Sequence, residues 1–223
     1  MPRQPTTGSV AEHQAGRIVV LAGTNGAGKS SVAGAAVRRD GANYFNPDEA
    51  TRRIRELRPG LSEAEANSRA WEHGKTLLEH AIEGRLAFNF ETTLGGHTIT
   101  ALLEQALDEG LDVLVWFVGL DSPERHIARV KARVSQGGHH IPDEKIRERY
   151  EASRLNLIRL LPRLTELRLF DNSAEADPAT GHTPEPLFVL HMKRGAITAM
   201  CPPADVPGWA KPIVAAALRP RRS

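Results

Sequence analysis

Short apolar runs alternate along this chain with longer segments in which apolar residues recur at helical spacing. The runs typical of strands cover residues 18–22, 43–45, 86–90, 113–118 and 167–170. The segments typical of helices cover residues 29–39, a stretch after Pro47, and residues 62–84, 98–109, 123–134 and 143–161. Strands that alternate with helices predict an α/β fold, with a mostly parallel sheet and helices on both of its faces.

Local signals mark several helix ends. Ser62 and Glu65 have the spacing of a capping box, Gly84 is typical of a C-terminal stop, and Ser122 before Pro123 is typical of a helix start. The helix between Ser62 and Gly84 is expected to bury one apolar stripe, consisting of Trp71, Leu77, Leu78, Ala81 and Ile82.

The two ends of the chain differ from its middle. Residues 1–16 are polar and without period, so we expect a flexible N-terminal segment. Residues 17–223 then form one domain, with a lid at about 122–161 and a hairpin and tail at about 174–223. The hairpin is predicted from two strand-like segments, 187–193 and 196–200, on either side of Arg194-Gly195, and it should join the sheet edge antiparallel.

A phosphate-binding loop follows the first strand. Residues 23–30 fit the pattern G-x-x-x-x-G-K-[ST] in full, between a strand and a helix. Glycines let backbone N–H groups turn toward the phosphates, Lys29 neutralises the β and γ charges, and the Ser30 hydroxyl coordinates Mg²⁺. The sequence therefore predicts a P-loop for ATP and Mg²⁺ that consists of Gly23, Thr24, Asn25, Gly26, Ala27, Gly28, Lys29, Ser30 and Ser31.

A P-loop by itself does not distinguish a kinase from a GTPase, a motor or a helicase. A small-molecule kinase also needs a carboxylate that orients the acceptor hydroxyl and takes its proton, at the carboxyl end of a neighbouring strand. Asp48 follows the second strand and has that position, so it is the predicted catalytic base and substrate contact. Its alternative role is to cap the helix that follows, which aspartate does well.

Further polar side chains follow the next two strands. Open α/β sheets bind ligands at this edge, so Glu91 and Thr93 are predicted substrate contacts, although a threonine here also suits a simple turn. Asp121 is predicted to hold Mg²⁺ through water, together with Ser30. The alternative for Asp121 is an ordinary helix start at Asp121-Ser122-Pro123.

The predicted lid is rich in arginine. Residues 124–168 carry eleven basic and six acidic side chains, a local excess of 11 − 6 = +5. Arg133 and Arg149, on the two helices of the lid, are predicted to stabilise the transferring phosphoryl group, with a solvated or salt-bridged surface position as the alternative. His139 and His140, in the linker between these helices, lack a third ligand at suitable spacing and are expected in the lid loop and not at a metal.

Composition narrows the list of partners. The 29 basic and 27 acidic residues leave a net charge of +2, so no overall field attracts the chain to nucleic acid or to a membrane surface. The longest apolar stretch, residues 111–120, is too short to span a bilayer. Cys201 is the only cysteine, which excludes an internal disulfide. A cytoplasmic protein is expected.

Five segments together resemble the zeta-toxin family of P-loop kinases, and its small stand-alone branch in particular. They are GTNGAGKS, NPD, FETTL, RVSQGGHHIPDEKIRERY and LFDNS, within about residues 17–173. The resemblance implies ATP-dependent phosphorylation of a sugar hydroxyl of UDP-N-acetylglucosamine, and a toxin that an antitoxin protein can neutralise. It matches Lys29 and Ser30 to nucleotide and Mg²⁺, Asp48 to the base, Glu91 and Thr93 to the substrate, and Arg133 and Arg149 to the lid.

Three functions are compatible with these residues. The first is a kinase of a nucleotide sugar or another small hydroxyl compound. The second is a nucleotide-gated ATPase without an acceptor, which would not need a carboxylate such as Asp48. The third is a polynucleotide-end kinase, against which the low charge and an aromatic content of 5% argue, because few rings are available to stack on bases.

Overall fold

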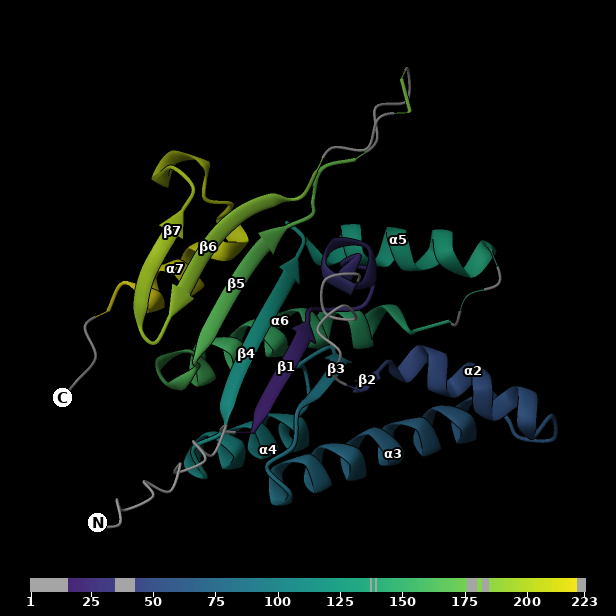
Figure 1. The fold of residues 1–223 in the computed structure, drawn as a ribbon. Coiled ribbons are helices and arrows are strands. Elements are labelled where there is room, and N and C mark those ends of the chain that lie inside the picture. The colour runs from purple at the N-terminus through teal and green to yellow at the C-terminus, as the bar shows by residue number, and fades with distance from the viewer. Residues whose placement is uncertain are drawn as a thin grey trace, which may run out of the picture.

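A computed structural model of the chain describes residues 16–34, 43–136, 138, 140–175, 180–181 and 185–219. Within them, seven strands form one sheet in the order β2-β3-β1-β4-β5-β6-β7 (Figure 1). The strands are β1 (Arg17–Ala22), β2 (Asn43–Phe45), β3 (Phe88–Thr92), β4 (Asp112–Gly119), β5 (Glu166–Asp171), β6 (Leu187–Lys193) and β7 (Ala196–Met200). β1 to β5 pair in parallel, whereas β6 and β7 are antiparallel. The predicted α/β class and the edge hairpin are confirmed.

Helices fill the connections between the strands. They are η1 (Ser30–Gly34), α2 (Pro47–Leu57), α3 (Glu63–Glu83), α4 (His97–Asp108), α5 (Pro123–Ser135), α6 (Asp143–Leu160) and α7 (Lys211–Ala217), with short turns at η2 (Leu161–Arg163), η3 (Pro203–Asp205) and η4 (Gly208–Ala210). The helix expected at 29–39 is described only to Gly34, and the rest of it lies outside the described residues. Likewise, of the predicted N-terminal segment only Gly16 is described.

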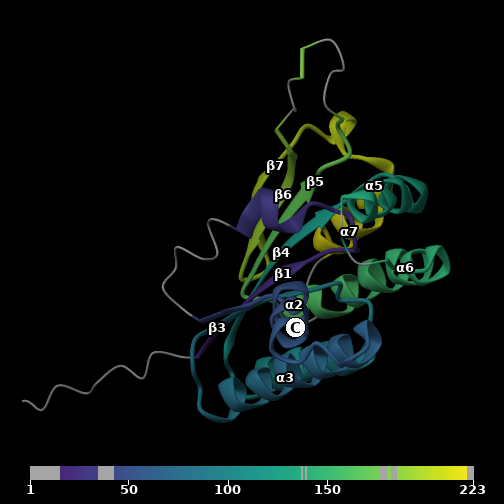
Figure 2. The ribbon, with the colours of Figure 1, turned by 90° about the vertical axis from the view of Figure 1, so that its right-hand side faces the viewer.

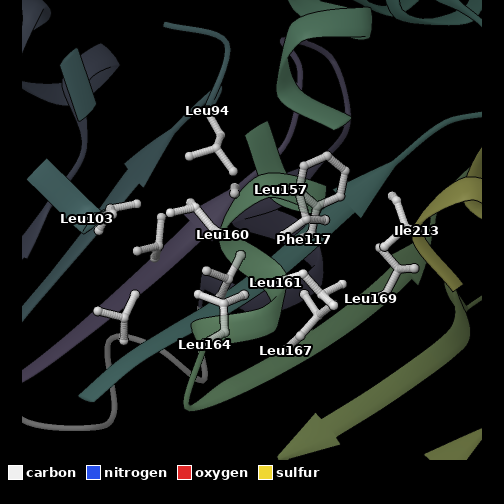
Figure 3. Close-up of a cluster of buried hydrophobic side chains, with 14 of the residues drawn as sticks. Leu94, Leu103, Phe117, Leu157, Leu160, Leu161, Leu164, Leu167, Leu169 and Ile213 are labelled. Carbon is white, nitrogen blue, oxygen red and sulfur yellow. The ribbon is translucent and has the colours of Figure 1, made fainter. Parts of the chain in front are cut away.

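Each face of the sheet buries one set of alternating strand residues. The main core joins β1, β4 and β5 to α3, α4, α6 and α7. Figure 3 shows Leu157, Leu160 and Leu161 within it, among side chains of the strands. Leu21 and Val118 point to the other face, where Val32 of η1 packs against them. Figure 1 shows α4, α6 and α7 behind the sheet and η1 in front of it, and Figure 2 shows most helices on one side. No sequence pattern had predicted α7.

Helix α3 begins and ends as predicted. Ser62 and Glu65 form both hydrogen bonds of the capping box, and Gly84 is the C-cap. Its expected stripe is wrong at one position, because Trp71 is 43% exposed whereas Leu78 is fully buried. The reason is the position of the helix: its first half packs beside α2, beyond the sheet, and only its second half covers strands (Figure 1).

Strand β3 starts two residues later than expected and ends two residues later. Leu86 is 56% exposed, since the chain is still in the turn after α3, where Arg85 has a φ of 50°. The shift matters for function. In the observed register Glu91 pairs with Leu21, one residue before the end of β1, and is therefore still part of the sheet.

Candidate active site

The glycine loop after β1 is held in a conformation that its glycines permit. Gly23, Gly26 and Gly28 all have positive φ, at 140°, 83° and 81°. A Cβ atom on Gly23 would overlap the carbonyl oxygen of Val118 in the neighbouring strand. The loop therefore cannot carry larger residues at these points, and its backbone N–H groups are available to an anion at the start of η1.

Lys29 lies at the centre of the charged groups of this edge. Its Nζ donates to the carbonyl oxygen of Gly23 at 3.0 Å. Burial lowers the pKa of Lys29, while the carboxylates of Glu91 and Asp48 raise this pKa and the guanidinium groups of Arg133 and Arg149 lower it. The charges that act on Lys29 thus come from β3, α2, α5 and α6, and all four were predicted from sequence to share one site with it.

Ser30 meets a carboxylate directly. Its Oγ donates to Oε1 of Glu91 at 2.7 Å, and the same oxygen accepts a hydrogen bond from the hydroxyl of Tyr44. Glu91 is only 8% exposed, and it also lines the cavity described below. A hydroxyl and a carboxylate are oxygen donors of the kind that Mg²⁺ prefers. The residue types at this point therefore fit a magnesium ion.

Asp121 has other partners in this structure. Its carboxylate accepts from Arg125 Nε at 2.8 Å and from Ser122 Oγ at 3.1 Å. Partial burial raises the pKa of Asp121, but these two hydrogen bonds outweigh it and the pKa is lowered. None of the contacts found among the described residues joins Asp121 to Ser30, and those residues contain no group of three acidic, histidine or cysteine side chains suited to a metal ion. The role of Asp121 at Mg²⁺ stays a prediction. Of the two histidines expected in the lid loop, His139 lies outside the described residues.

Asp48 does not cap helix α2. The N-cap is Asn46, whose Oδ1 accepts from the backbone N–H groups of Asp48 at 2.9 Å and Glu49 at 3.2 Å. The carboxylate of Asp48 is left 61% exposed and accepts from Arg133 Nη1 at 3.3 Å. The capping alternative is therefore wrong, and the side chain of Asp48 is available for chemistry.

Two of the arginines in the predicted lid point to this site. Arg149 Nη1 donates to Oδ1 of Asn25 in the glycine loop at 2.8 Å, and burial lowers the pKa of Arg149. Besides its contact with Asp48, Arg133 buries Nε and Nη2, and neither atom has a hydrogen-bond partner in the described part of the chain. By contrast, Arg125, Arg129, Arg147 and Arg154 bind nearby carboxylates or carbonyl groups.

A cavity of about 670 Å³ opens beside these groups. Lys29, Asp48, Glu91, Thr93 and Arg149 all line it, together with Trp71 of α3 and apolar residues of the α5–α6 linker. Thr93 Oγ1 accepts from the backbone N–H of Gly95 at 3.4 Å, so it forms a turn as well. The arrangement offers a cation for phosphate at one end and a carboxylate for a hydroxyl within the same space.

The predicted lid is not a separate unit over its whole length. Ile127, Val130, Ile141 and Ile146 form a small cluster of their own between α5 and the start of α6. From Tyr150 onward, however, α6 belongs to the main core. The part of the predicted lid before Tyr150 therefore packs apart from the main core, and the lid boundary at 161 stays a prediction.

Sequence reasoning missed two residues that support the loop. His126 is 1% exposed, and its Nδ1 lies 2.8 Å from the carbonyl oxygen of Asn25, to which it donates as the neutral ring. Asn172, after β5, donates from Nδ2 to the carbonyl oxygen of Ala27 at 2.9 Å. Both are more than a hundred positions away from the loop, so no local pattern announces them.

The burial of His126 predicts a pH-dependent stability. Burial lowers the pKa of His126 to about 4 from 6.5, because the charged ring loses hydration. Below pH 6.5 this histidine binds a proton in the unfolded chain, whereas in the folded chain it stays neutral until about pH 4. The contribution of His126 to the free energy of unfolding is therefore fully present above pH 6.5 and is lost as the pH falls toward 4. Urea unfolding should show a loss of about 2.5 kcal/mol between pH 7 and 4.5 from this residue. The variant His126→Gln should lack that component, and an equal pH dependence in both proteins would contradict the assignment.

Comparison with known proteins places the chain in a family. The sequence model of the zeta toxin family matches residues 6–176. An uncharacterized protein of Haemophilus influenzae (strain Rd) is 30% identical over 135 residues, which is 60% of this chain and 92% of the relative. Within the residues described, no helix is long and apolar enough to cross a membrane.

Solved structures share the fold at low identity. A chain of the AvrRxo1-ORF1:-ORF2 complex with ATP matches 94% of this chain and 66% of its own length, with a TM-score of 0.62 and 16% identity. A chain of the PezAT chromosomal toxin–antitoxin system of Streptococcus pneumoniae matches 74% of this chain and 72% of its own length, with a TM-score of 0.50 and 14% identity. The present chain thus spans just under two thirds of the AvrRxo1 chain.

Proposed function

Because this chain belongs to the zeta toxin family, we propose that it is an ATP-dependent kinase that phosphorylates a hydroxyl group of a nucleotide sugar such as UDP-N-acetylglucosamine. One observation carries the proposal. Lys29 of the P-loop lies in the field of Asp48, Glu91, Arg133 and Arg149, beside a cavity of about 670 Å³. A P-loop, an exposed carboxylate that caps no helix and two arginines near them are the parts that phosphoryl transfer needs.

Each residue has a defined task in the proposed reaction. The loop N–H groups and Lys29 bind the phosphates of ATP. Asp48 accepts the proton of the acceptor hydroxyl, the hydroxyl oxygen bonds to the γ-phosphorus, and the bond from that phosphorus to the bridging oxygen breaks, which releases ADP. Arg133 and Arg149 compensate the charge that spreads over the transferring oxygens.

Ser30 and Glu91 would hold Mg²⁺, which when bound neutralises phosphate charge and orients the leaving group. The hydrogen bond from Ser30 to Glu91 supports this assignment. The hydroxyl proton of Ser30 points to the carboxylate of Glu91, so the lone pairs of the hydroxyl oxygen are available to a metal ion. Thr93 and Glu91, which line the cavity, would contact the acceptor. Asp121 would then contribute through water at most.

The cavity also bears on the alternatives. An ATPase without an acceptor does not need a cavity of this size next to Asp48, whose carboxylate caps no helix. Such a kinase would work in the cytoplasm, where ATP is available. The PezAT assembly is a toxin–antitoxin system by its description, and an antitoxin-type partner for this chain is part of the proposal.

The decisive assay detects the product. The protein is incubated with Mg·ATP and a panel of nucleotide sugars, and new phosphate esters are followed by phosphorus NMR. A new phosphomonoester signal with at least one nucleotide sugar, absent with Lys29→Ala, is the expected result. ADP and inorganic phosphate as the only products across the panel would refute the nucleotide-sugar kinase.

Lys29→Ala should weaken ATP binding by about 10-fold or more. A charged hydrogen bond contributes about 1.5–3 kcal/mol, and the carboxylates around Lys29 would repel the phosphates once the ammonium group is gone. The control is Lys131→Ala, since Lys131 is exposed and, among the residues that the structure describes, pairs with Asp143 at 2.7 Å. Titration with a fluorescent ATP analogue measures both variants, and equal affinities would remove Lys29 from the nucleotide site.

A further inference from the structure

One face of α3 forms a wall of the cavity. Asn67, Trp71, Gly74 and Lys75 line the space, at the spacing i, i+4, i+7 and i+8 that places side chains on one side of a helix. Thr51 of α2 donates to Oδ1 of Asn67 at 2.9 Å, which ties this face to the helix that carries Asp48. This hydrogen bond therefore connects the wall to the helix on which Asp48 lies.

Trp71 differs from the other two tryptophans of the chain. Trp209 is 5% exposed and donates from Nε1 to Asp171 Oδ1 at 2.7 Å, and Trp116 stacks on the guanidinium group of Arg168. Trp71 is 43% exposed, and within the described part of the chain its ring makes no hydrogen bond or ring contact. When a ligand covers an exposed aromatic ring in a cavity, the burial of the ring stabilises the complex.

The wall next to Trp71 is also built of an aromatic ring. Phe45 packs against α3 where Gly74 leaves room, because a Cβ atom on Gly74 would overlap the Phe45 ring. The edge of His73 fixes the same ring, with centroids 5.8 Å apart. Ile141 and Pro142 of the α5–α6 linker line the same cavity. The lining therefore combines these apolar side chains with polar and charged groups, Asp48 among them.

We propose that Trp71 selects the acceptor by stacking on the flat face of a ring, a sugar or a nucleobase, while Asp48 meets the hydroxyl group. This inference rests on the proposed kinase function and adds to it the residue that would recognise the ring of the acceptor. A cavity of about 670 Å³ accommodates a ligand of drug size, more than an open-chain polyol requires. Open-chain polyols are therefore excluded as preferred acceptors, because they offer no face to the indole.

Intrinsic fluorescence tests the stacking without any turnover. UDP-N-acetylglucosamine, UDP and N-acetylglucosamine are titrated separately, with sorbitol as the acyclic probe. The expected result is a change in tryptophan emission with UDP-N-acetylglucosamine that Trp71→Leu abolishes, that the matched variant Trp116→Leu retains, and that sorbitol does not cause. If UDP causes the change and N-acetylglucosamine does not, the ring that stacks on Trp71 is the base. If N-acetylglucosamine causes it and UDP does not, that ring is the sugar.

Affinity gives the second measurement. Loss of aromatic stacking should raise the dissociation constant of the responding compound about 10-fold or more in Trp71→Leu, while Trp71→Phe restores most of the affinity and neither variant changes ATP affinity. No response to any of the three ring compounds, or equal affinity in Trp71→Leu, would overturn the inference. A Trp71-dependent response without phosphate transfer would refute the kinase function and leave the ring site standing.

Discussion

Arg149→Ala is expected to lower the maximal rate of phosphoryl transfer about 1000-fold, equivalent to about 4 kcal/mol of barrier. Arg149 reaches the P-loop through Asn25 and lines the cavity, so its charge is held where negative charge accumulates on the transferring oxygens. Because that charge is largest in the transition state, ATP affinity should change far less than the rate. Arg133→Ala should act in the same direction, since two of its buried nitrogen atoms lack partners in the described residues.

Steady-state kinetics combined with nucleotide titration separates rate from binding for these variants. Arg147→Ala is the matched control, because Arg147 lies on the same helix but pairs with Glu124 at the surface. Thermal unfolding should show all three variants folded, since α5 and α6 keep their apolar faces. Unchanged maximal rates for Arg133→Ala and Arg149→Ala would eliminate both arginines from catalysis, and loss of ATP affinity alone would make them ground-state phosphate ligands.

Asp48→Asn should reduce phosphoryl transfer by about 100-fold or more and leave ATP binding intact. The amide has nearly the same shape as the carboxylate but cannot accept the acceptor's proton. The fold should tolerate the change, because Asn46 and not Asp48 caps α2. Glu49→Gln, one position along the same helix turn, is the control for loss of a negative charge. Rapid-quench measurement of the ester gives the rates, and normal transfer by Asp48→Asn would remove the base from the mechanism.

Local patterns predicted the parts of this molecule that local physics determines. The glycine loop, the capping box at Ser62 and the hairpin at Arg194-Gly195 each depend on residues within a few positions of one another. The parallel direction of most strands could also be predicted, because alternating strands and helices favour a parallel sheet. Accordingly the loop, Asp48 and Glu91 were all expected at one edge of the sheet.

The remaining features depend on packing that no local pattern encodes. In Asn46-Pro47-Asp48 both the amide oxygen of Asn46 and the carboxylate of Asp48 can cap a helix, and only the start of α2 shows that Asn46 does so. Helical spacing correctly placed Trp71 on the same face of α3 as Leu78. It could not predict that this face borders a cavity at Trp71 and not the core. The contact of Glu91 with Ser30 depends on the register of β1 and β3, which no sequence pattern predicted, and the strand itself was expected two residues earlier.

The balance of products tests the central claim that this cavity hosts phosphoryl transfer to an acceptor. Purified protein turns over Mg·ATP with and without UDP-N-acetylglucosamine, and ADP, inorganic phosphate and phosphate ester are quantified in the same samples. The account predicts one ester for each ADP when the acceptor is present, little ADP without it, and loss of the ester in Asp48→Asn. ADP matched by inorganic phosphate, at a rate that neither the acceptor nor Asp48→Asn changes, would contradict it.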